Sequence, residues 1–194
     1  MRGIEDVPIL YDAMMAMAEA VGFAGWRRAL VAGARGSVLD IGCGTGRNLP
    51  LFDGNRAALG LDPRLQLLLT ARRRAPGRPL VLARAEALPF RDEAFDTVVS
   101  GLVFCSVGDA ARGLAEIRRT LRADGRLRML EHVRSRHALV ARWQDFIQPW
   151  WTWLAGGCHP NRDTKTSVEA AGLEIEEEGR RSRGNLRLFT AHRR

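Results

Sequence analysis

Three glycines at alternate positions, Gly42, Gly44 and Gly46, follow a short apolar run at residues 38–41. The apolar run predicts a buried strand, and the glycines predict a sharp turn toward residues 48–52. Glycine tolerates positive φ and lacks a Cβ atom, so the backbone amides of such a turn can lie against a ligand. N–H groups at the start of a following helical turn favour an anion. This stretch is therefore the first candidate for a ligand site.

The spacing of the glycines separates two kinds of nucleotide site. A dinucleotide fingerprint has the order GxGxxG, whose third glycine would fall at Arg47, whereas this loop has the order GxGxG. The pattern thus argues against NAD. Asp62 ends the next apolar run about 20 residues after Gly42, where a carboxylate can bind two ribose hydroxyls. An ordinary tight turn between strand and helix is the alternative, and it does not account for Asp62.

The sequence VLDIGCGTG at residues 38–46, taken with Asp62, resembles the class I S-adenosylmethionine-dependent methyltransferases of the methyltransferase type 11 group. The resemblance implies an enzyme whose cofactor is S-adenosyl-L-methionine. The residues that it implies for cofactor binding are Asp40, Gly42, Gly44, Gly46, Asp62, Pro63, Ala85, Glu86 and Leu102.

Residues 84–90 resemble the segment of these methyltransferases that flanks the adenine, which is why Ala85 and Glu86 are included. The family often has Asp or Asn where this chain has Arg84, to accept a hydrogen bond from the exocyclic amine of the adenine. Either Glu86 or a backbone carbonyl would accept that bond here. Leu102 lies just beyond the carboxyl end of a predicted strand, and ligands of open α/β sheets bind at that end.

The order of the predicted elements indicates how these residues are positioned. Strands are predicted at residues 38–41, 57–61, 80–83, 95–100, 126–131, 173–178 and 186–191. Helices are predicted at residues 8–32, 64–75, 110–121 and 165–171. Strand and helix alternate up to residue 131, which predicts a doubly wound, parallel α/β sheet. The resemblance implies a Rossmann-like, mostly parallel sheet of seven strands with a reversed edge strand.

The length of 194 residues predicts a single domain, residues 1–194. In the helix at residues 64–75, the apolar spacing predicts that Leu65, Leu68 and Leu69 face inward. The arginines at residues 72–74 fit the end of a helix dipole and are expected to face water.

The N-terminal segment, residues 1–34, is predicted to be a helical lid. Tyr11, Asp12, the methionines that follow and Trp26 resemble the N-terminal segment of the methyltransferases related to ubiquinone and menaquinone biosynthesis, which folds over the cofactor. The alternative is a helix that covers one edge of the sheet, because a methionine-rich apolar face is more often core.

Residues 133–164 form a predicted helical insert that contains four of the five tryptophans. Together with LVFCSV at residues 102–107, the insert resembles the mammalian methyltransferase-like thiol methyltransferases and the bacterial phosphatidylethanolamine N-methyltransferases. A tryptophan-rich wall favours a small lipophilic acceptor, which could be a thiol, an amine or a phospholipid head group. The candidate pocket residues are Tyr11, Phe104, Cys105, His132, Trp150 and Trp151.

Two other roles remain open for the tryptophans, packing in the core and contact with a membrane. Interfacial indoles keep one end wet, so a membrane contact predicts that Trp150, Trp151 and Trp153 are partly exposed. Glu5 and Asp6 do not fit a secretion signal, and no apolar run reaches the length of a transmembrane helix. The chain is expected to be cytoplasmic, with peripheral membrane contact left open.

His132 is the candidate catalytic residue. It ends the predicted strand at residues 126–131, at the sheet edge where the glycine loop and Asp62 also converge. An imidazole that titrates near neutral pH could take a proton from a thiol or ammonium acceptor, or orient that acceptor. The alternative is a structural histidine, bonded to Asp145 or to a backbone carbonyl.

The formal net charge of +8 comes almost entirely from arginine, since Lys165 is the only lysine. This charge leaves open an RNA methyltransferase. However, the arginines are not interleaved with aromatic residues, and SGLVF stands where amino-group nucleic-acid methyltransferases have Asn/Asp-Pro-Pro-aromatic. Nucleic acid is thus disfavoured as a partner. A non-catalytic S-adenosylmethionine-binding partner protein is the other alternative, and it predicts a broken cofactor loop, whereas this loop is intact.

Metal chemistry is also disfavoured by the sequence. The three cysteines, Cys43, Cys105 and Cys158, show no CxxC or Cys/His ligand spacing, and no cluster of Asp and Asn is apparent. The sequence therefore predicts no metal site and a reducing compartment.

Overall fold

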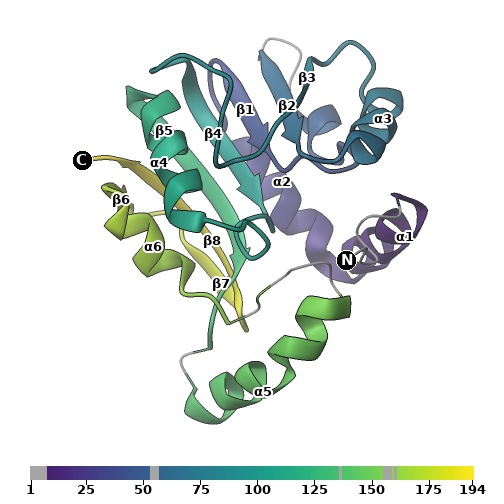
Figure 1. The fold of residues 1–194 in the computed structure, drawn as a ribbon, viewed down its shortest axis with the longest axis vertical. Coiled ribbons are helices and arrows are strands. Elements are labelled where there is room, and N and C mark those ends of the chain that lie inside the picture. The colour runs from purple at the N-terminus through teal and green to yellow at the C-terminus, as the bar shows by residue number, and fades with distance from the viewer. Residues whose placement is uncertain (1–7, 53–56, 136, 155–158, 160) are drawn as a thin grey trace.

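The computed structural model of the chain describes residues 8–52, 57–135, 137–154, 159 and 161–194. A mixed β-sheet forms its centre (Figure 1). The strands lie in the sheet in the order β3 (Leu80–Leu82), β2 (Ala58–Asp62), β1 (Val38–Ile41), β4 (Phe95–Gly101), β5 (Leu121–His132), β8 (Leu186–Arg193) and β6 (Leu173–Ile175). A short strand, β7 (Arg181–Arg183), pairs with β8.

The direction of the strands confirms the predicted doubly wound, mostly parallel sheet. Neighbours from β3 through β5 are parallel, and β8 runs antiparallel to both β5 and β6. Two details differ from the prediction. The reversed strand lies between β5 and β6 rather than at the edge, and β7 adds an eighth strand to the described sheet, because a tight connection lets it pair back onto β8.

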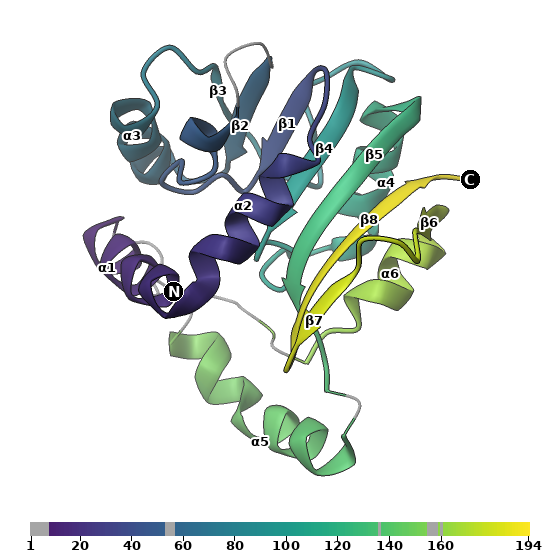
Figure 2. The same cartoon turned by 180° about the vertical axis from the view of Figure 1, so that it is seen from behind.

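Helices cover both faces of the sheet. Figures 1 and 2 show α4 and α6 on one face and α2 on the opposite face. A π-helical turn at Glu19–Phe23 joins α1 to α2 within the predicted helix at residues 8–32. The helices are α1 (Pro8–Ala18), α2 (Ala24–Ala32), α3 (Leu65–Arg74), α4 (Ala110–Thr120), α5 (Ala138–Leu154) and α6 (Thr164–Ala170).

Two apolar cores lie on the two faces of the sheet. Along β5, Leu127 and Met129 pack on the side of α4 and α6, whereas Leu130 packs on the side of α2 and α3. This alternation follows from the period of two residues in a strand. Because both faces of the parallel sheet are covered, a ligand site is expected at the carboxyl ends of the strands.

Helix α3 differs in its buried stripe from the prediction. Leu65 and Leu69 are 53% and 44% exposed, so the expectation that they face inward was wrong, while Leu68 is buried as expected. The stripe that faces the sheet is instead shifted around the helix by about one residue. The buried residues of this stripe are Leu67, Leu68 and Ala71.

Candidate functional site

The glycine loop lies at the carboxyl end of β1. Gly42, Gly44 and Gly46 have φ angles of 62°, 55° and 78°, a region that residues with a Cβ atom rarely adopt. A Cβ atom at Gly42 would lie 2.5 Å from the Val103 side chain, and one at Gly46 would lie 2.8 Å from that of Ala71. Glycine is therefore required here for the backbone conformation and for close packing against α3 and the segment after β4.

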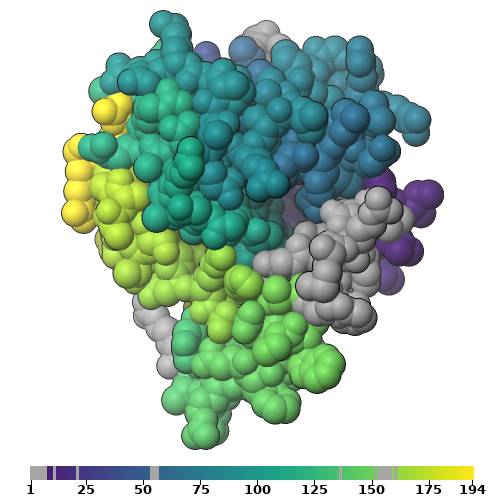
Figure 3. Space-filling view, viewed as in Figure 1, coloured from purple at the N-terminus to yellow at the C-terminus, as the bar shows by residue number. Residues whose placement is uncertain are grey.

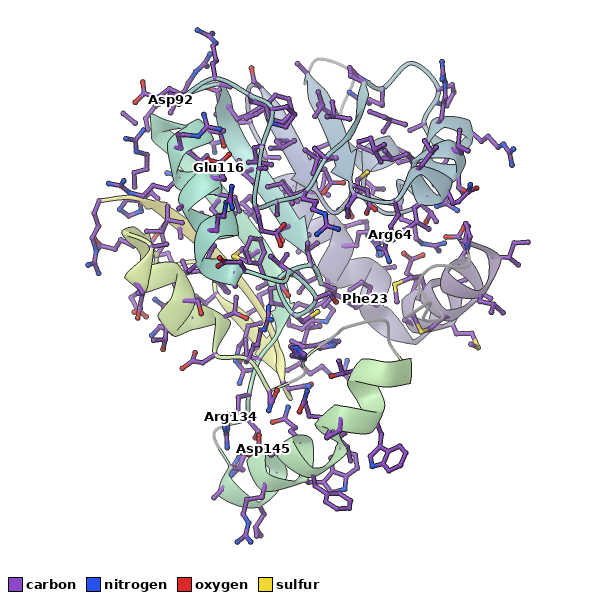
Figure 4. All side chains as sticks on the ribbon, in the orientation of Figure 1. Phe23, Arg64, Asp92, Glu116, Arg134 and Asp145 are labelled. Carbon is purple, nitrogen blue, oxygen red and sulfur yellow. The ribbon has the colours of Figure 1, made fainter. Side chains whose placement is uncertain are left out.

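Asp62, the last residue of β2, fixes the shape of this loop. Its Oδ2 accepts a hydrogen bond from the Gly44 N–H at 3.0 Å, and its Oδ1 accepts one from the Arg64 N–H at 2.9 Å. The guanidinium of Arg64 lies 3.3 Å from the same Oδ1 (Figure 4). Asp62 is buried, whereas Pro63 beside it is exposed. Asp62, the residue predicted to bind ribose, thus also stabilises the conformation of the loop.

Asp40, on β1, has one carboxylate oxygen in use and one free. Oδ1 accepts a hydrogen bond from Asn48 Nδ2 at 2.9 Å, while Oδ2 is buried and has no hydrogen-bond donor among the described residues. Burial raises the pKa of Asp40 to about 7, although the Asn48 bond acts in the opposite direction. A buried, unpaired carboxylate oxygen fits an ammonium group, such as the one at the amino-acid end of S-adenosylmethionine.

The segment after β4 faces the glycine loop in an unusual backbone conformation. Leu102 has a φ of 60°, in the left-handed region that non-glycine residues seldom occupy. Its N–H donates to the Leu130 carbonyl at 2.7 Å, which holds this residue against β5. Strained conformations of this kind are found at ligand sites, where surrounding structure holds them in place.

Glu131, on β5, supplies much of that surrounding structure. Its Oε1 accepts hydrogen bonds from the N–H groups of Val103 and Phe104, at 3.0 and 3.1 Å, and from the Ser100 hydroxyl at 3.3 Å. Burial raises the pKa of Glu131 to about 7, against the lowering effect of these donors. The other oxygen, Oε2, is buried without a donor among the described residues. No role was predicted for Glu131, and its signal was a carboxylate at the carboxyl end of the predicted strand at residues 126–131.

Several residues that were predicted to line the site have buried side chains. Phe104 is 1% exposed, and its ring lies close to Gly113. Ala85 and Cys105 are also buried. Phe104 and Cys105 are thus covered in this structure, and their contact with an acceptor stays a prediction. The segment turns back after β4, with the Ser106 N–H donating to the Val103 carbonyl, and this turn directs both side chains inward.

Glu86 is engaged at the start of α4. Its Oε1 accepts hydrogen bonds from the N–H groups of Gly108 and Asp109, at 3.1 and 3.4 Å. Asp109 in turn caps α4 by accepting from the Arg112 N–H. Glu86 thus joins the predicted adenine segment to α4, and its contact with an adenine stays a prediction.

His132 is the last residue of β5 and is half-buried. It pairs with Leu186 of β8, and strand alternation puts it on the same face as Leu130, toward α2. Asp145 accepts hydrogen bonds from Arg134 and Asn161, at 2.6 and 2.9 Å, so it is not held by His132 (Figure 4). The catalytic role of His132 remains a prediction.

The end of the predicted insert contacts the segment after β4. The His159 N–H donates to the Cys105 carbonyl at 2.8 Å. Arg162 Nη1 donates to the carbonyls of Phe104 and Val107, at 2.7 and 2.6 Å. His159 and Arg162 thus hold the end of the predicted insert against the segment after β4, and the role of the insert as the wall of an acceptor pocket stays a prediction.

The tryptophans of α5 do not all serve that wall. Trp150 is 74% exposed, so its side chain points away from the body of the molecule, and its contact with an acceptor stays a prediction. The side chains of Tyr11, Trp151 and Trp153 lie outside the described part of the structure.

The N-terminal helices are joined to the glycine loop by an ion network that the sequence analysis missed. Asp12 accepts a hydrogen bond from the Thr45 hydroxyl at 2.7 Å and forms ion pairs with Arg47 at 3.2 Å and Arg74 at 2.7 Å. Arg74 also donates to the Thr45 carbonyl. The expectation that the arginines of α3 simply face water was therefore wrong for Arg74.

Glu19 extends this network along the π-helical turn. It pairs with Arg47 and with Arg27, and Arg27 also donates to Asn48, the partner of Asp40. The hydrogen bond from Arg47 lowers the pKa of Glu19. Burial would raise the pKa of Asp12, but the bonds from Arg74, Thr45 and Arg47 bring it below its ordinary value. Both carboxylates therefore stay ionised at neutral pH.

Two further features concern metal binding and membrane insertion. Among the described residues, no group of three or more His, Cys, Asp or Glu side chains could hold a metal ion. None of the helices in the described ranges combines the length and the apolar character needed to cross a membrane.

Comparison with known proteins decides the family. A family model for a methyltransferase domain matches residues 39–144, which contain the glycine loop, Asp62 and Glu131. The chain belongs to this methyltransferase family. Thiol S-methyltransferase TMT1B of Homo sapiens is 35% identical over 158 residues, covering 75% of the chain and 64% of the relative. Phosphatidylethanolamine N-methyltransferase of Cereibacter sphaeroides is 29% identical over 165 residues, covering 82% of the chain and 80% of the relative.

The methyltransferase fold is shared with solved structures. One is a methyltransferase in complex with the Trm112 methyltransferase activator of Haloferax volcanii, which has a TM-score of 0.73 and 16% identity, covering 99% of this chain and 98% of that one. At this identity the likeness shows the fold. The chain spans 59% and 64% of the length of the two TMT1B relatives that it matches, from Rattus norvegicus and Homo sapiens.

Proposed function

We propose that this methyltransferase-family protein transfers a methyl group from S-adenosyl-L-methionine to a small lipophilic acceptor. The observation that carries the proposal is the hydrogen bond from the Gly44 N–H to Asp62 Oδ2, which ties the glycine loop to the carboxylate predicted to bind ribose. Asp40 supports the same conclusion, because its free oxygen is a suitable acceptor for an ammonium group. The residues present thus fit both ends of this cofactor.

The bound cofactor would supply a methyl group on a positively charged sulfur, which needs no metal and no covalent enzyme intermediate. The residues of the chain then have to hold the acceptor in line with that methyl group and keep water away. Glu131 would help to hold the acceptor indirectly, since it fixes Val103 and Phe104 next to the glycine loop. The Asp12 network would help to keep water away, because it holds α1 against the same loop.

The class of acceptor is inferred from the insert and from the relatives. Residues 159–162 contact the segment after β4, so the insert lies beside the predicted methyl-transfer position. Two relatives carry the names thiol S-methyltransferase and phosphatidylethanolamine N-methyltransferase. A thiol, an amine or a phospholipid head group is therefore proposed. His132 is the candidate base or orienting group for it.

The cofactor half of the proposal is tested by calorimetry with S-adenosylmethionine and S-adenosylhomocysteine. Asp62→Asn should weaken binding of both by about 1.5–3 kcal/mol, the range for a hydrogen bond to a charged group. Asn keeps an oxygen for the Gly44 N–H, so the loop should remain folded. Unchanged affinity in a folded Asp62→Asn protein would remove Asp62 from the site.

The acceptor half is tested with the methyl-labelled cofactor and a panel of alkyl thiols, phenols, amines and phospholipids, with transfer RNA as the competing acceptor. We expect labelled product from lipophilic thiols, amines or phospholipids. Label transferred only to transfer RNA, or to no acceptor despite tight cofactor binding, would contradict the proposed acceptor class while leaving cofactor binding intact.

A further inference from the structure

Helix α5 has its polar side turned toward the protein and its apolar side turned toward solvent. The outward residues are 81% exposed at Leu139, 62% at Trp143, 75% at Phe146 and 74% at Trp150. With Val140, they form what we call the outer face of α5. Positions 139, 143, 146 and 150 are spaced as one side of an α-helix. This polarity is the reverse of that of an ordinary surface helix.

The orientation of α5 is fixed by hydrogen bonds on its inner side. Gln144, which is 4% exposed, accepts from the Ser135 N–H at 2.8 Å. Asp145 accepts from Arg134 and Asn161 (Figure 4). Rotating the helix to bury its outer face would break these bonds and would move Gln144 away from the Ser135 N–H. The inverted arrangement is therefore specified by the sequence.

The outer face belongs to neither apolar core. Both cores are built from the sheet, α2, α3, α4 and α6, and α5 contributes no residue to them among the described residues. Figure 3 shows α5 projecting from the body of the molecule, so its outer face is open on that side. A contiguous exposed apolar face of this kind marks an interaction surface rather than scattered surface residues.

The composition of the surface favours a lipid bilayer over a protein. Tryptophan and phenylalanine on one side of a helix are typical of helices that lie in the membrane interface. Asp145 is the one acidic residue of α5, and its charge is paired with Arg134, while Arg142 is exposed. The chain as a whole carries a net charge of +8. Anionic head groups are complementary to that charge.

Helix α1 extends the apolar surface. Its exposed apolar residues are Ile9, Leu10, Met14 and Met17. Figures 1 and 2 both show the C-terminal end of α5 directed toward α1, at the end of the molecule where the glycine loop opens. A bilayer touching both helices would therefore face the carboxyl ends of the strands, from which an acceptor would enter.

We propose that the outer face of α5 docks this protein on anionic phospholipid membranes, with α1 as a second contact. The inference deepens the proposed function, because it gives a lipophilic acceptor a source next to the site. Docking itself does not require catalysis, so the two proposals can fail separately.

The test is flotation with vesicles of phosphatidylcholine alone and of an equal mixture of phosphatidylcholine and phosphatidylglycerol. The wild-type chain should float with the mixed vesicles and much less with the neutral ones. Trp143→Ser combined with Phe146→Ser should lower the partition coefficient at least about tenfold, since each removes a large buried apolar area from the complex. Arg142→Gln should lower it about fivefold, on mixed vesicles only.

The matched control replaces two exposed leucines away from this surface, Leu65→Ser with Leu69→Ser on α3. It should float like the wild type. Calorimetry with S-adenosylhomocysteine shows whether each variant is folded, and it should give wild-type affinity for all of them. Equal flotation of the α5 variant and the wild type would overturn the proposal. A second outcome would also overturn the proposal. In it, the wild type binds no vesicles and forms a dimer that the α5 substitutions dissociate in sedimentation velocity. The outer face would then be a protein interface.

Discussion

The guanidinium group of Arg74 lies 2.7 Å from the carboxylate of Asp12, and this pair joins α3 to the N-terminal helix across the glycine loop. Thr45, inside the loop, bonds to both partners. The position of α1 is thus coupled to the conformation of the loop. A residue of the predicted lid and a residue of the sheet-covering helices meet at the backbone that is expected to hold the cofactor.

Asp12→Asn is expected to release α1. The change removes the charge that Arg47 and Arg74 share, and hydrogen bonds to charged groups contribute about 1.5–3 kcal/mol. Opening of α1 should therefore become at least about tenfold more frequent. Limited proteolysis within residues 8–32 measures it, and S-adenosylmethionine should dissociate faster. Asp92→Asn, which removes an exposed carboxylate paired with Arg119, is the control. Equal cleavage of both variants would show that the network does not hold α1.

Cofactor affinity should depend on pH through Asp40. Its pKa of about 7 means that it is neutral in acid and ionised in mild alkali, and only the ionised form attracts an ammonium group. Binding of S-adenosylhomocysteine should tighten several-fold from about pH 6 to about pH 7.5. Asp40→Asn should abolish this change. Methylthioadenosine, which lacks the amino-acid end, should show little pH dependence with the wild type. A wild-type pH profile in the Asp40→Asn protein would contradict the assignment.

The raised pKa of Asp40 also predicts that the stability of the folded protein falls as the pH rises, whereas cofactor affinity rises. In the unfolded chain Asp40 titrates near its ordinary value of 3.8, so between that value and about pH 7 the folded protein holds a proton that the unfolded chain has lost. The contribution of this group is therefore fully present below about pH 4 and is lost as the pH rises through 7. Urea unfolding of the free Asp40→Asn protein should show a smaller decline over this range than the wild type.

Glu131→Ala should destabilise the protein by about 2–5 kcal/mol. It leaves the N–H groups of Val103 and Phe104 without their acceptor, and each unsatisfied buried group costs about 1–3 kcal/mol. Glu131→Gln keeps an acceptor oxygen and should retain most of the stability. Urea unfolding measures both, with Glu174→Ala on β6 as the exposed control. If Glu131→Gln were as destabilising as Glu131→Ala, the charge rather than the hydrogen bonds would hold the segment.

His132→Ala should lower turnover at least about tenfold on the acceptor that the panel identifies, since general base catalysis contributes about 10²–10⁴-fold. Affinity for S-adenosylmethionine should stay close to the wild-type value. A structural histidine would instead lose thermal stability and keep its specific activity. His137→Ala, at an exposed position before α5, is the matched control. Near-normal turnover in folded His132→Ala protein would reduce this residue to a structural role.

The central strand, the glycine loop and Asp62 could be predicted because their signals are local. An apolar run, three glycines and a carboxylate at the end of the next run each reflect the backbone at their own positions. Strand and helix alternation predicted the sheet in the same way. The φ angles of Gly42, Gly44 and Gly46 and the bond from Gly44 to Asp62 agree with what that pattern requires.

The ion network around Asp12 could not be predicted, because its partners are distant in the sequence. Arg74 ends α3, where a cation already satisfies the helix dipole, so nothing in its surroundings indicated a partner 62 residues away. Helix α5 shows a second limit. The sequence predicted a helical, tryptophan-rich insert, but it does not say which side of the helix meets the protein. The side that meets the protein depends on hydrogen bonds from Ser135 to Gln144 and from Arg134 and Asn161 to Asp145.

The polar attachment of α5 also determines how this helix can leave the body of the protein. Hydrogen bonds exchange with water at a net cost of about 0.5–1.5 kcal/mol each, far less than the cost of exposing an apolar core. Local opening of residues 133–164 should therefore need less free energy than global unfolding and leave both cores closed. Amide hydrogens of α5 would then exchange well before those of β1 and β4. An acceptor larger than the closed site could enter by this route without unfolding the sheet.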